Sequence, residues 1–220
     1  MYTRVSPVEY FRTLVDEPAS IPLLEAAASL ALDAYPSLDL QAVLDDVDRL
    51  CRQLADACRR ASTETARLQQ VLRFFYGVHR FAGNAAAYDD PDNSYLHRVL
   101  ETRRGIPITL AVLLREFATH VGIDADGVSF PGHFLVRVNL HAGTVVIDPF
   151  TGASLDRAEL ERRAAPHGVG ADALLAPATS WQGLARMLNN LRAIHARRGR
   201  ADLLDPVLER LRILQRAGER

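Results

Sequence analysis

One stretch, residues 103–123 (RRGIPITLAVLLREFATHVGI), constrains the fold more than any other part of the chain. Gly105 breaks the preceding segment, and Pro107 suits the first position of a helix, where no backbone N–H is needed. Gly122 suits a left-handed helix cap. Apolar residues between them recur at helical spacing, which predicts one apolar stripe: Leu110, Leu113, Leu114, Phe117 and Val121. A helix of about fifteen residues is roughly 22 Å long, enough to run through the middle of a small domain.

A two-stranded antiparallel ribbon is predicted to follow this helix. Residues 133–139 and 145–148 alternate apolar and polar side chains, on either side of a turn at 141–143. In a register that places the apolar side chains of both strands on one face, His133 and Asp148 share the other face. They then lie directly opposite each other across the ribbon, or offset by two residues. Their Cβ atoms would then be about 5 Å apart, or somewhat less than about 7–8 Å. The alternation therefore predicts a hydrogen bond between the imidazole and the carboxylate.

A histidine oriented by an aspartate is the base half of a nucleophile–His–Asp site. No nucleophile-elbow motif accompanies Ser94 or Ser129, so neither serine is favoured as the nucleophile. Cys51 and Cys58 lie on the apolar stripe of a predicted helix, and we expect both to be small core residues.

Several runs of the sequence together resemble one protein family. They are RFAGN (80–84), NSYLHRVLETRRGIPITLAVL (93–113), FPGHFLVRV (130–138), IDPF (147–150) and ARMLNNLRAIHARRG (185–199). These runs are similar to the SirB-type proteins of bacteria, which join a transglutaminase-like core to a tetratricopeptide-like helical tail, and the likeness covers most of the chain. It implies an α+β fold in three parts. These are a helical N-terminal region (1–78), a transglutaminase-like, papain-like core with a central helix and a small antiparallel sheet (79–165), and a tetratricopeptide-like helical pair (178–220).

The resemblance also bears on activity. In the transglutaminase-like and papain-like arrangement a cysteine begins the central helix, where the helix dipole and the histidine favour its thiolate. Without a gap in the match, that position is Pro107, which has no nucleophilic atom. Thr109 carries the nearest hydroxyl, about 200° around the helix. We therefore expect a vestigial His133–Asp148 pair in a cleft that includes Thr109 and is further lined by Asn93, Pro107, Phe130, Pro131 and Gly132.

The rest of the chain is predicted to be largely helical. The apolar spacing and the caps predict helices over 8–15, 21–34, 38–60, 63–77, 95–103, 154–163, 181–198 and 201–216, with a loop over 79–93 and a linker over 164–177. For the helix over 95–103, Asp92, Asn93 and Ser94 offer an N-cap. The last two helices have the spacing of one helical repeat and cannot bury their own apolar face. They should dock on the N-terminal helices or pair with another chain.

Composition narrows the function classes. With a net charge of −1, the protein as a whole has no electrostatic attraction to nucleic acid or to an anionic membrane. The sequence contains no lysine, so no Schiff base can form on one. The seven histidines and two cysteines show no metal-ligand spacing, so neither a metal nor a cofactor is expected. No apolar run is long enough for a membrane span, and no signal peptide is recognised, which predicts a cytoplasmic protein.

The tail is basic, with nine Arg against four acidic residues from 181 to 220. This favours a solvated helical face over an anionic partner, and the lack of interleaved aromatic residues argues against nucleic acid.

These observations leave three hypotheses. The first is a non-catalytic or weakly catalytic transglutaminase-like protein that binds a protein or peptide in the cleft, with the helical tail as a second contact surface. The second is a hydrolase or amide-processing enzyme in which Thr109 or a cysteine supplies the nucleophile to His133 and Asp148. The third is a structural role, including homo-oligomer formation through the C-terminal helices.

Overall fold

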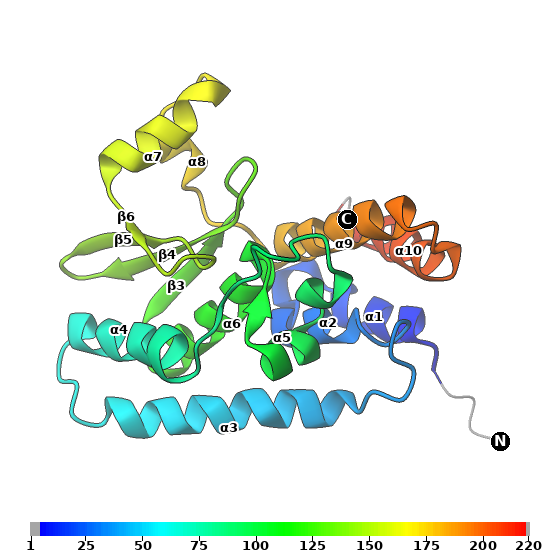
Figure 1. Cartoon of the computed structure of the whole chain (residues 1–220), viewed down its shortest axis with the longest axis horizontal. Helices are drawn as coiled ribbons and strands as arrows, with labels where there is room; N and C mark the ends of the chain where they lie inside the picture. Colours follow the sequence, from blue (N-terminus) through cyan, green and yellow to red (C-terminus); the bar gives the residue numbers. More distant parts are fainter. Residues whose placement is uncertain (1–4, 219–220) are drawn as a thin grey trace.

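The computed structural model describes residues 5–218 as a helical body beside a small twisted sheet (Figure 1). The main helices are α1 (Pro7–Val15), α2 (Leu23–Ser29), α3 (Leu40–Cys58), α4 (Glu64–Leu72), α5 (Leu96–Thr102), α6 (Pro107–His120), α7 (Arg157–Ala164), α8 (Ala171–Leu174), α9 (Ser180–Arg197) and α10 (Ala201–Gly218). The strands are β1 (Ala82–Gly83), β2 (Arg104–Gly105), β3 (Asp124–Val128), β4 (Leu135–Leu140), β5 (Gly143–Ile147) and β6 (Ser154–Leu155). The α+β class is confirmed. No helix among residues 5–218 is long and apolar enough to cross a membrane.

Helix α6 is the centre of the fold. Pro107 occupies its first turn, and Gly122 ends it with a φ of +73°, as the sequence predicts. The amide of Ile123 donates to the carbonyl of Ala118 at 3.0 Å, which completes a Schellman-type cap. The predicted stripe is buried at Leu110, Leu113, Leu114 and Phe117, but burial extends beyond it, because every residue from 107 to 114 is buried. The first two turns of α6 are therefore enclosed on all sides, whereas Thr119 and His120 at its end are exposed.

The sheet has four strands, in the order β3–β4–β5–β6, and all its pairs are antiparallel. The predicted ribbon is its centre: Val136 pairs with Ile147 and Val138 with Val145, across a tight turn between Leu140 and Gly143. Strand β3 was not predicted. It lies on the outer side of β4, where its acidic side chains find partners on the neighbouring strand.

The two faces of the sheet pack against different groups of apolar residues. On one face Phe134, Val136, Val138 and Ile147 belong to the main hydrophobic core, which includes α6. On the other face, a second hydrophobic cluster lies under α7 and α8. Its buried members are Val128, Phe130, Leu135, Val146, Leu155, Leu160, Ala164 and Ala171. Both faces are therefore covered, and α7 stands over the site described below (Figure 1).

The C-terminal hairpin of α9 and α10 docks on the N-terminal helices, one of the two predicted outcomes. Its buried residues, among them Leu184, Leu188 and Leu214, share the main core with α1 and α2. The Trp181 indole N–H donates to the carbonyl of Leu214 at 2.7 Å, which joins the two helices. The face that α10 buries differs from the predicted one, because it includes Arg210, which is 1% exposed and lies 2.5 Å from Asp33.

Other predicted elements differ in extent. Helix α2 ends at Ser29, and the chain continues to residue 34 in turns with i to i−3 hydrogen bonds. The helix predicted over 63–77 changes to a π-helix at Arg73–Val78. The cap predicted for α5 is wrong: residues 91–94 form a 3₁₀-helix that Asp90 caps, and α5 starts after Tyr95 without a side-chain cap. The predicted linker contains α8.

Candidate functional site

His133 and Asp148 form a hydrogen bond, as the alternation predicts. The distance from His133 Nε2 to Asp148 Oδ1 is 2.8 Å. Asp148 follows β5 directly, and the β4–β5 register places it two residues from His133, beside Leu135. The carboxylate is buried, with a side chain that is 4% exposed, whereas the imidazole is 23% exposed. The pair therefore has a covered end at Asp148 and an open end at His133.

The carboxylate of Asp148 has three donors. Besides His133, the amide of Phe150 donates to Oδ1 at 2.9 Å, and Arg163 Nη1 lies 3.4 Å from Oδ2. Burial raises the pKa of Asp148, but these hydrogen bonds lower it by more, and the net effect is a pKa below the ordinary value. Asp148 is thus ionised at neutral pH and acts only as an acceptor. His133 Nε2 must then carry the hydrogen of the hydrogen bond to Asp148. The other ring nitrogen, Nδ1, is left without a bond to this carboxylate.

A turn at residues 130–133 presents the imidazole. The His133 amide donates to the Phe130 carbonyl at 3.0 Å, and Gly132 has a φ of +69°, which glycine adopts without strain. Phe130 is buried in the second hydrophobic cluster and anchors the turn, while Pro131 is half-buried. Within residues 5–218, no group hydrogen-bonds to His133 Nδ1, and this atom is not among the buried unpaired ones. Nδ1 is therefore accessible to a ligand.

The start of α6 is held by Asn93. The Thr109 hydroxyl donates to the carbonyls of Asn93 and Ile106, at 2.7 and 3.0 Å, and the Ile106 amide donates to the same Asn93 carbonyl at 3.3 Å. Thr109 is fully buried. The Asn93 side chain bonds Asn84 and the carbonyls of Ala87 and Tyr88, so it ties down the loop instead of facing an open cleft.

Strand β1 links the two groups of residues. The Gly83 amide donates to the Phe150 carbonyl at 2.9 Å, and the Asn84 amide donates to the Gly105 carbonyl at 3.1 Å. Segment 148–150 is thereby joined to the strand that leads into α6. In the described part of the chain, no hydrogen bond, ion pair or ring contact joins His133 directly to Asn93, Pro107 or Thr109. The predicted residues thus form two groups joined through backbone.

Sequence reasoning missed two residues of this site, Arg163 and Tyr76. Arg163 lies on α7, within ELERRA, where nothing distinguishes an arginine that reaches a buried carboxylate from one in solvent. The Tyr76 hydroxyl donates to the Pro149 carbonyl at 3.3 Å and lies near enough to Asp148 for that charge to help raise the tyrosine pKa, after burial. Both were unpredictable because their partners are distant in sequence.

Both cysteines are core residues, as predicted. Cys51 and Cys58 line the buried face of α3. Burial raises the pKa of Cys51 to about 12, with smaller contributions from Glu116 and Asp48, and burial also raises the pKa of Cys58. A thiolate is therefore disfavoured at both positions. No group of three or more metal-ligating side chains occurs among residues 5–218.

Comparison with known proteins bears on the family. The sequence model described as the transglutaminase-like superfamily matches residues 41–189. A UPF0162 protein of Xylella fastidiosa (strain Temecula1) is 39% identical over 199 residues, which cover 86% of this chain and 70% of that protein. A UPF0162 protein of Pseudomonas aeruginosa is 31% identical, over 84% of this chain and 68% of that protein. Protein SirB1 of Salmonella typhimurium is 28% identical, over 63% and 51%. No solved structure matches.

Proposed function

Because the chain belongs to the transglutaminase-like superfamily, and within it to the SirB-type UPF0162 family, we propose that it is a non-catalytic member that binds a peptide segment of a partner protein at His133. One observation carries the proposal. The His133–Asp148 pair is intact and ionised at Asp148, yet no hydroxyl or thiol within residues 5–218 is hydrogen-bonded to the ring. What is left is an oriented imidazole that can bind a ligand.

The pair defines what the ligand must offer. With its hydrogen fixed on Nε2 by Asp148, a neutral His133 presents Nδ1 as an acceptor. A backbone N–H of an extended peptide is a suitable donor. When the ring is protonated, Nδ1–H can instead donate to the adjacent carbonyl of the peptide. The imidazole can therefore bind a peptide in either charge state.

The alternative, a hydrolase, needs a nucleophile in contact with His133, and the contacts of Thr109 and Cys51 do not support it. The Thr109 hydroxyl is buried and already shared between two carbonyls, and the Cys51 thiol has a pKa of about 12. A serine, threonine or cysteine nucleophile needs a base within hydrogen-bond reach. In the proposal Thr109 is a structural residue that fastens α6 to Asn93.

The proposal gives the C-terminal hairpin a second role in binding. We propose that α9 and α10 form a tetratricopeptide-like unit and that its outer groove is a second contact surface for the same partner. The groove has a volume of about 270 Å³, and its apolar lining includes Trp181, Leu208 and Leu211. Homo-oligomer formation through these helices stays a prediction, which sedimentation velocity of the full chain tests.

The experiment is selection from a displayed peptide library, followed by affinity measurement with matched variants. His133→Gln keeps a nitrogen donor for Asp148 but removes the Nδ1 acceptor, so it should weaken the selected peptides about tenfold without unfolding the protein. His167→Gln, at an exposed position, is the control and should leave affinity unchanged. Equal binding by the wild type and His133→Gln would refute the site.

A second experiment tests the absence of catalysis. The full chain is treated with a fluorophosphonate and with iodoacetamide, and modified peptides are identified by mass spectrometry. No adduct is expected at 107–115 in the native protein. An adduct at Thr109 that disappears in Thr109→Val and persists in Thr109→Ser would establish the hydrolase instead.

A further inference from the structure

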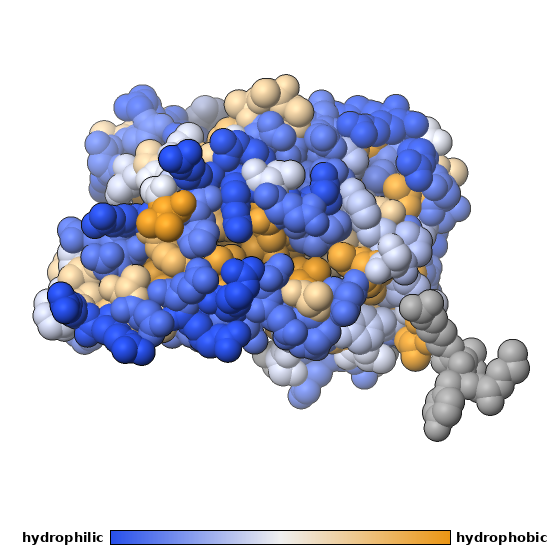
Figure 2. Space-filling view, turned by 60° about the horizontal axis from the view of Figure 1, so that its bottom comes forward, coloured by the Kyte–Doolittle hydropathy of each residue, from blue (hydrophilic) through white to orange (hydrophobic). Residues whose placement is uncertain are grey.

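A pocket of about 690 Å³ lies between α1, α2 and the segment that leads into α3. These elements are on the right of Figure 1, whereas strand β5, which Asp148 follows in the chain, is on the left. Figure 2 turns the side that carries α3 toward the viewer and shows apolar residues in furrows between rows of hydrophilic ones. The volume is in the range of small-molecule binding sites. The pocket is thus a separate site from the His133–Asp148 pair.

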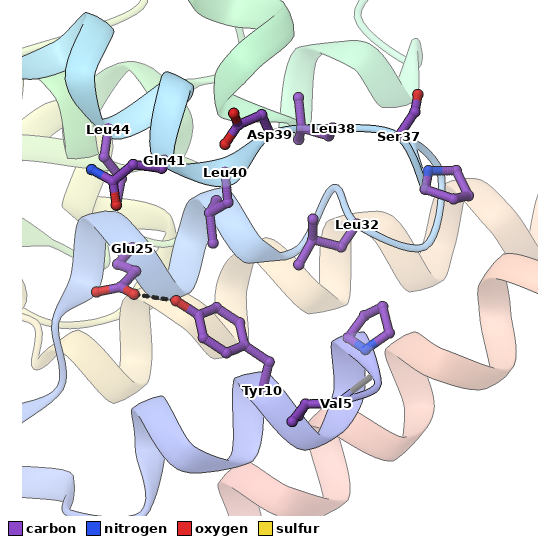
Figure 3. Close-up of a pocket in the computed structure, with 12 residues that line it drawn as sticks. Val5, Tyr10, Glu25, Leu32, Ser37, Leu38, Asp39, Leu40, Gln41 and Leu44 are labelled. Carbon is purple, nitrogen blue, oxygen red and sulfur yellow. Dashed lines mark hydrogen bonds between the residues drawn. The ribbon is translucent and has the colours of Figure 1, made fainter. Parts of the chain in front are cut away.

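The walls of this pocket are mainly aliphatic. They comprise Val5, Pro7, Leu32, Pro36, Leu38, Leu40 and Leu44. Val5 is 63% exposed, so apolar surface at this wall is open to solvent. Figure 3 shows Leu32 and Leu40 in the space between the Tyr10 ring and the chain that enters α3. An aliphatic or aromatic body would bury apolar surface here, and the hydrophobic effect favours such burial.

One end of the pocket is polar and negatively charged. The Tyr10 hydroxyl on α1 donates to Glu25 Oε1 on α2, as Figure 3 shows. Burial, followed by the hydrogen bond and charge of Glu25, raises the pKa of Tyr10 to about 12, so the phenol stays neutral. Glu25 is half-buried, and no cation in the described part of the chain pairs with it. A carboxylate in such a place favours a cationic neighbour.

The second acidic residue of the pocket reinforces this polarity. Asp39 lies at the rim and caps α3 by accepting from the Ala42 amide at 3.3 Å. Among residues 5–218, those that line the pocket include no arginine, lysine or histidine. The formal charge of these lining residues is therefore −2, in a chain whose net charge is −1.

We propose that this pocket binds a small amphipathic organic cation, with an ammonium or guanidinium head at Glu25 and an apolar body along Leu32, Leu38 and Leu40. Phosphates and carboxylates are repelled by the two acids. A second copy of this chain is disfavoured, because a two-fold contact through the pocket would bring the acidic surfaces of two copies, each with Glu25 and Asp39, against each other. The charge complementarity and the apolar walls thus select the same class of ligand.

Three probes with eight carbons each distinguish the contribution of head-group charge to affinity from that of the apolar chain: n-octylammonium, 1-octanol and octanoate. Their dissociation constants for the full chain are measured by ¹H–¹⁵N correlation spectra, which also report whether each variant folds. The expected order of affinity is ammonium, alcohol, carboxylate, with about tenfold between the first and the last. Higher ionic strength should weaken the ammonium and leave the alcohol unchanged.

Variants locate the effect at the pocket. Glu25→Gln keeps an acceptor for Tyr10 and should weaken n-octylammonium about tenfold, whereas Glu101→Gln, an exposed residue outside the pocket, should change nothing. Leu40→Arg places a cation in the wall and should reverse the preference in favour of octanoate. These results would support the site, independently of any result at His133.

Three outcomes would overturn the proposal. The first is equal affinity for all three probes, which would mean apolar adsorption only. The second is an unchanged n-octylammonium affinity in both a folded Glu25→Gln and a folded Leu40→Arg. The third is a self-associating chain that n-octylammonium dissociates in sedimentation velocity, which would identify a contact between copies.

Discussion

Gly83 faces the ring of Phe150 so closely that a Cβ at position 83 would lie 2.3–2.4 Å from ring atoms. The Gly83 amide also donates to the Phe150 carbonyl. This contact joins two of the sequence runs by which the family was first identified, RFAGN and IDPF. It holds the segment that contains Asp148 beside the strand that leads into α6.

Gly83→Ala should therefore lower the free energy of unfolding by about 1–3 kcal/mol, because the ring or the strand must move. Urea denaturation measures the change. Gly170→Ala is the control, since a Cβ there would meet no atom within 4 Å. Gly83→Ala combined with Phe150→Ala should cost less than the sum of the single changes. Additive costs would mean that the two residues do not contact each other.

The second prediction concerns the buried ion pair of Arg210 and Asp33. The Arg210 guanidinium also lies over the Phe11 ring, at 5.7 Å, and burial lowers its pKa despite Asp33. Asp33→Asn should cost about 3 kcal/mol or more, since it leaves a buried cation without a counter-charge. Glu209→Gln breaks surface ion pairs with Arg212 of α10 and Arg12 of α1 and should cost less than about 1 kcal/mol. Similar costs in the two variants would show that water reaches Arg210.

The third prediction is a pH dependence at Asp148. A carboxylate with a lowered pKa contributes stability that is complete above the ordinary aspartate range and is lost as the pH falls through the folded-state value. Asp148→Asn should cost about 1.5–3 kcal/mol at pH 7. The difference from the wild type should shrink steadily on acidification below about pH 4. Denaturation curves from pH 7 to pH 2.5 measure it, with the exposed Asp172→Asn as the control; a difference independent of pH would contradict an ionised Asp148.

The fourth prediction concerns the thiols. Because burial raises the pKa of both cysteines, iodoacetamide at pH 8 should modify neither quickly in the native protein, and both quickly in urea. Cys58, which is 8% exposed, should react before Cys51, which is 1% exposed. Cys51→Ala and Cys58→Ala assign the two rates by mass spectrometry. Rapid native labelling of Cys51 would reopen its candidacy as a nucleophile.

The central helix and the ribbon could be predicted because their signals are local. Pro107 and Gly122 mark the helix ends, and strict alternation fixes which residues of the ribbon share a face, which led to the His133–Asp148 hydrogen bond. Strand β3 has no such signal, because aspartate and glycine are poor strand formers. Its pairing depends on distant partners: Arg137 lies 3.0 Å from Asp126, and Asn139 donates to Asp124 at 2.9 Å.

Two arginines, one buried and one half-buried, show the same limit. From the sequence, the basic residues of the tail belong to a solvated face, and Arg210 has the spacing of such a residue. Its burial depends on Asp33, 177 positions earlier in the chain. Arg163 is held in the same way, by Asp148. Long-range ion pairs leave no periodic trace in a sequence, so their members could not be distinguished from ordinary surface charges.

Among residues 5–218, the second hydrophobic cluster beneath α7 and α8 has eight buried members, far fewer than the main core. Regions with few buried apolar contacts open at lower free energy than the rest of a protein. Amide hydrogens of α7 should therefore exchange with solvent well before those of α6. An opening of this layer would withdraw Arg163 from Oδ2 of Asp148 and leave the carboxylate bonded through Oδ1 to His133 and to the Phe150 amide, so the imidazole would lose a cationic neighbour of its partner before it lost the partner itself.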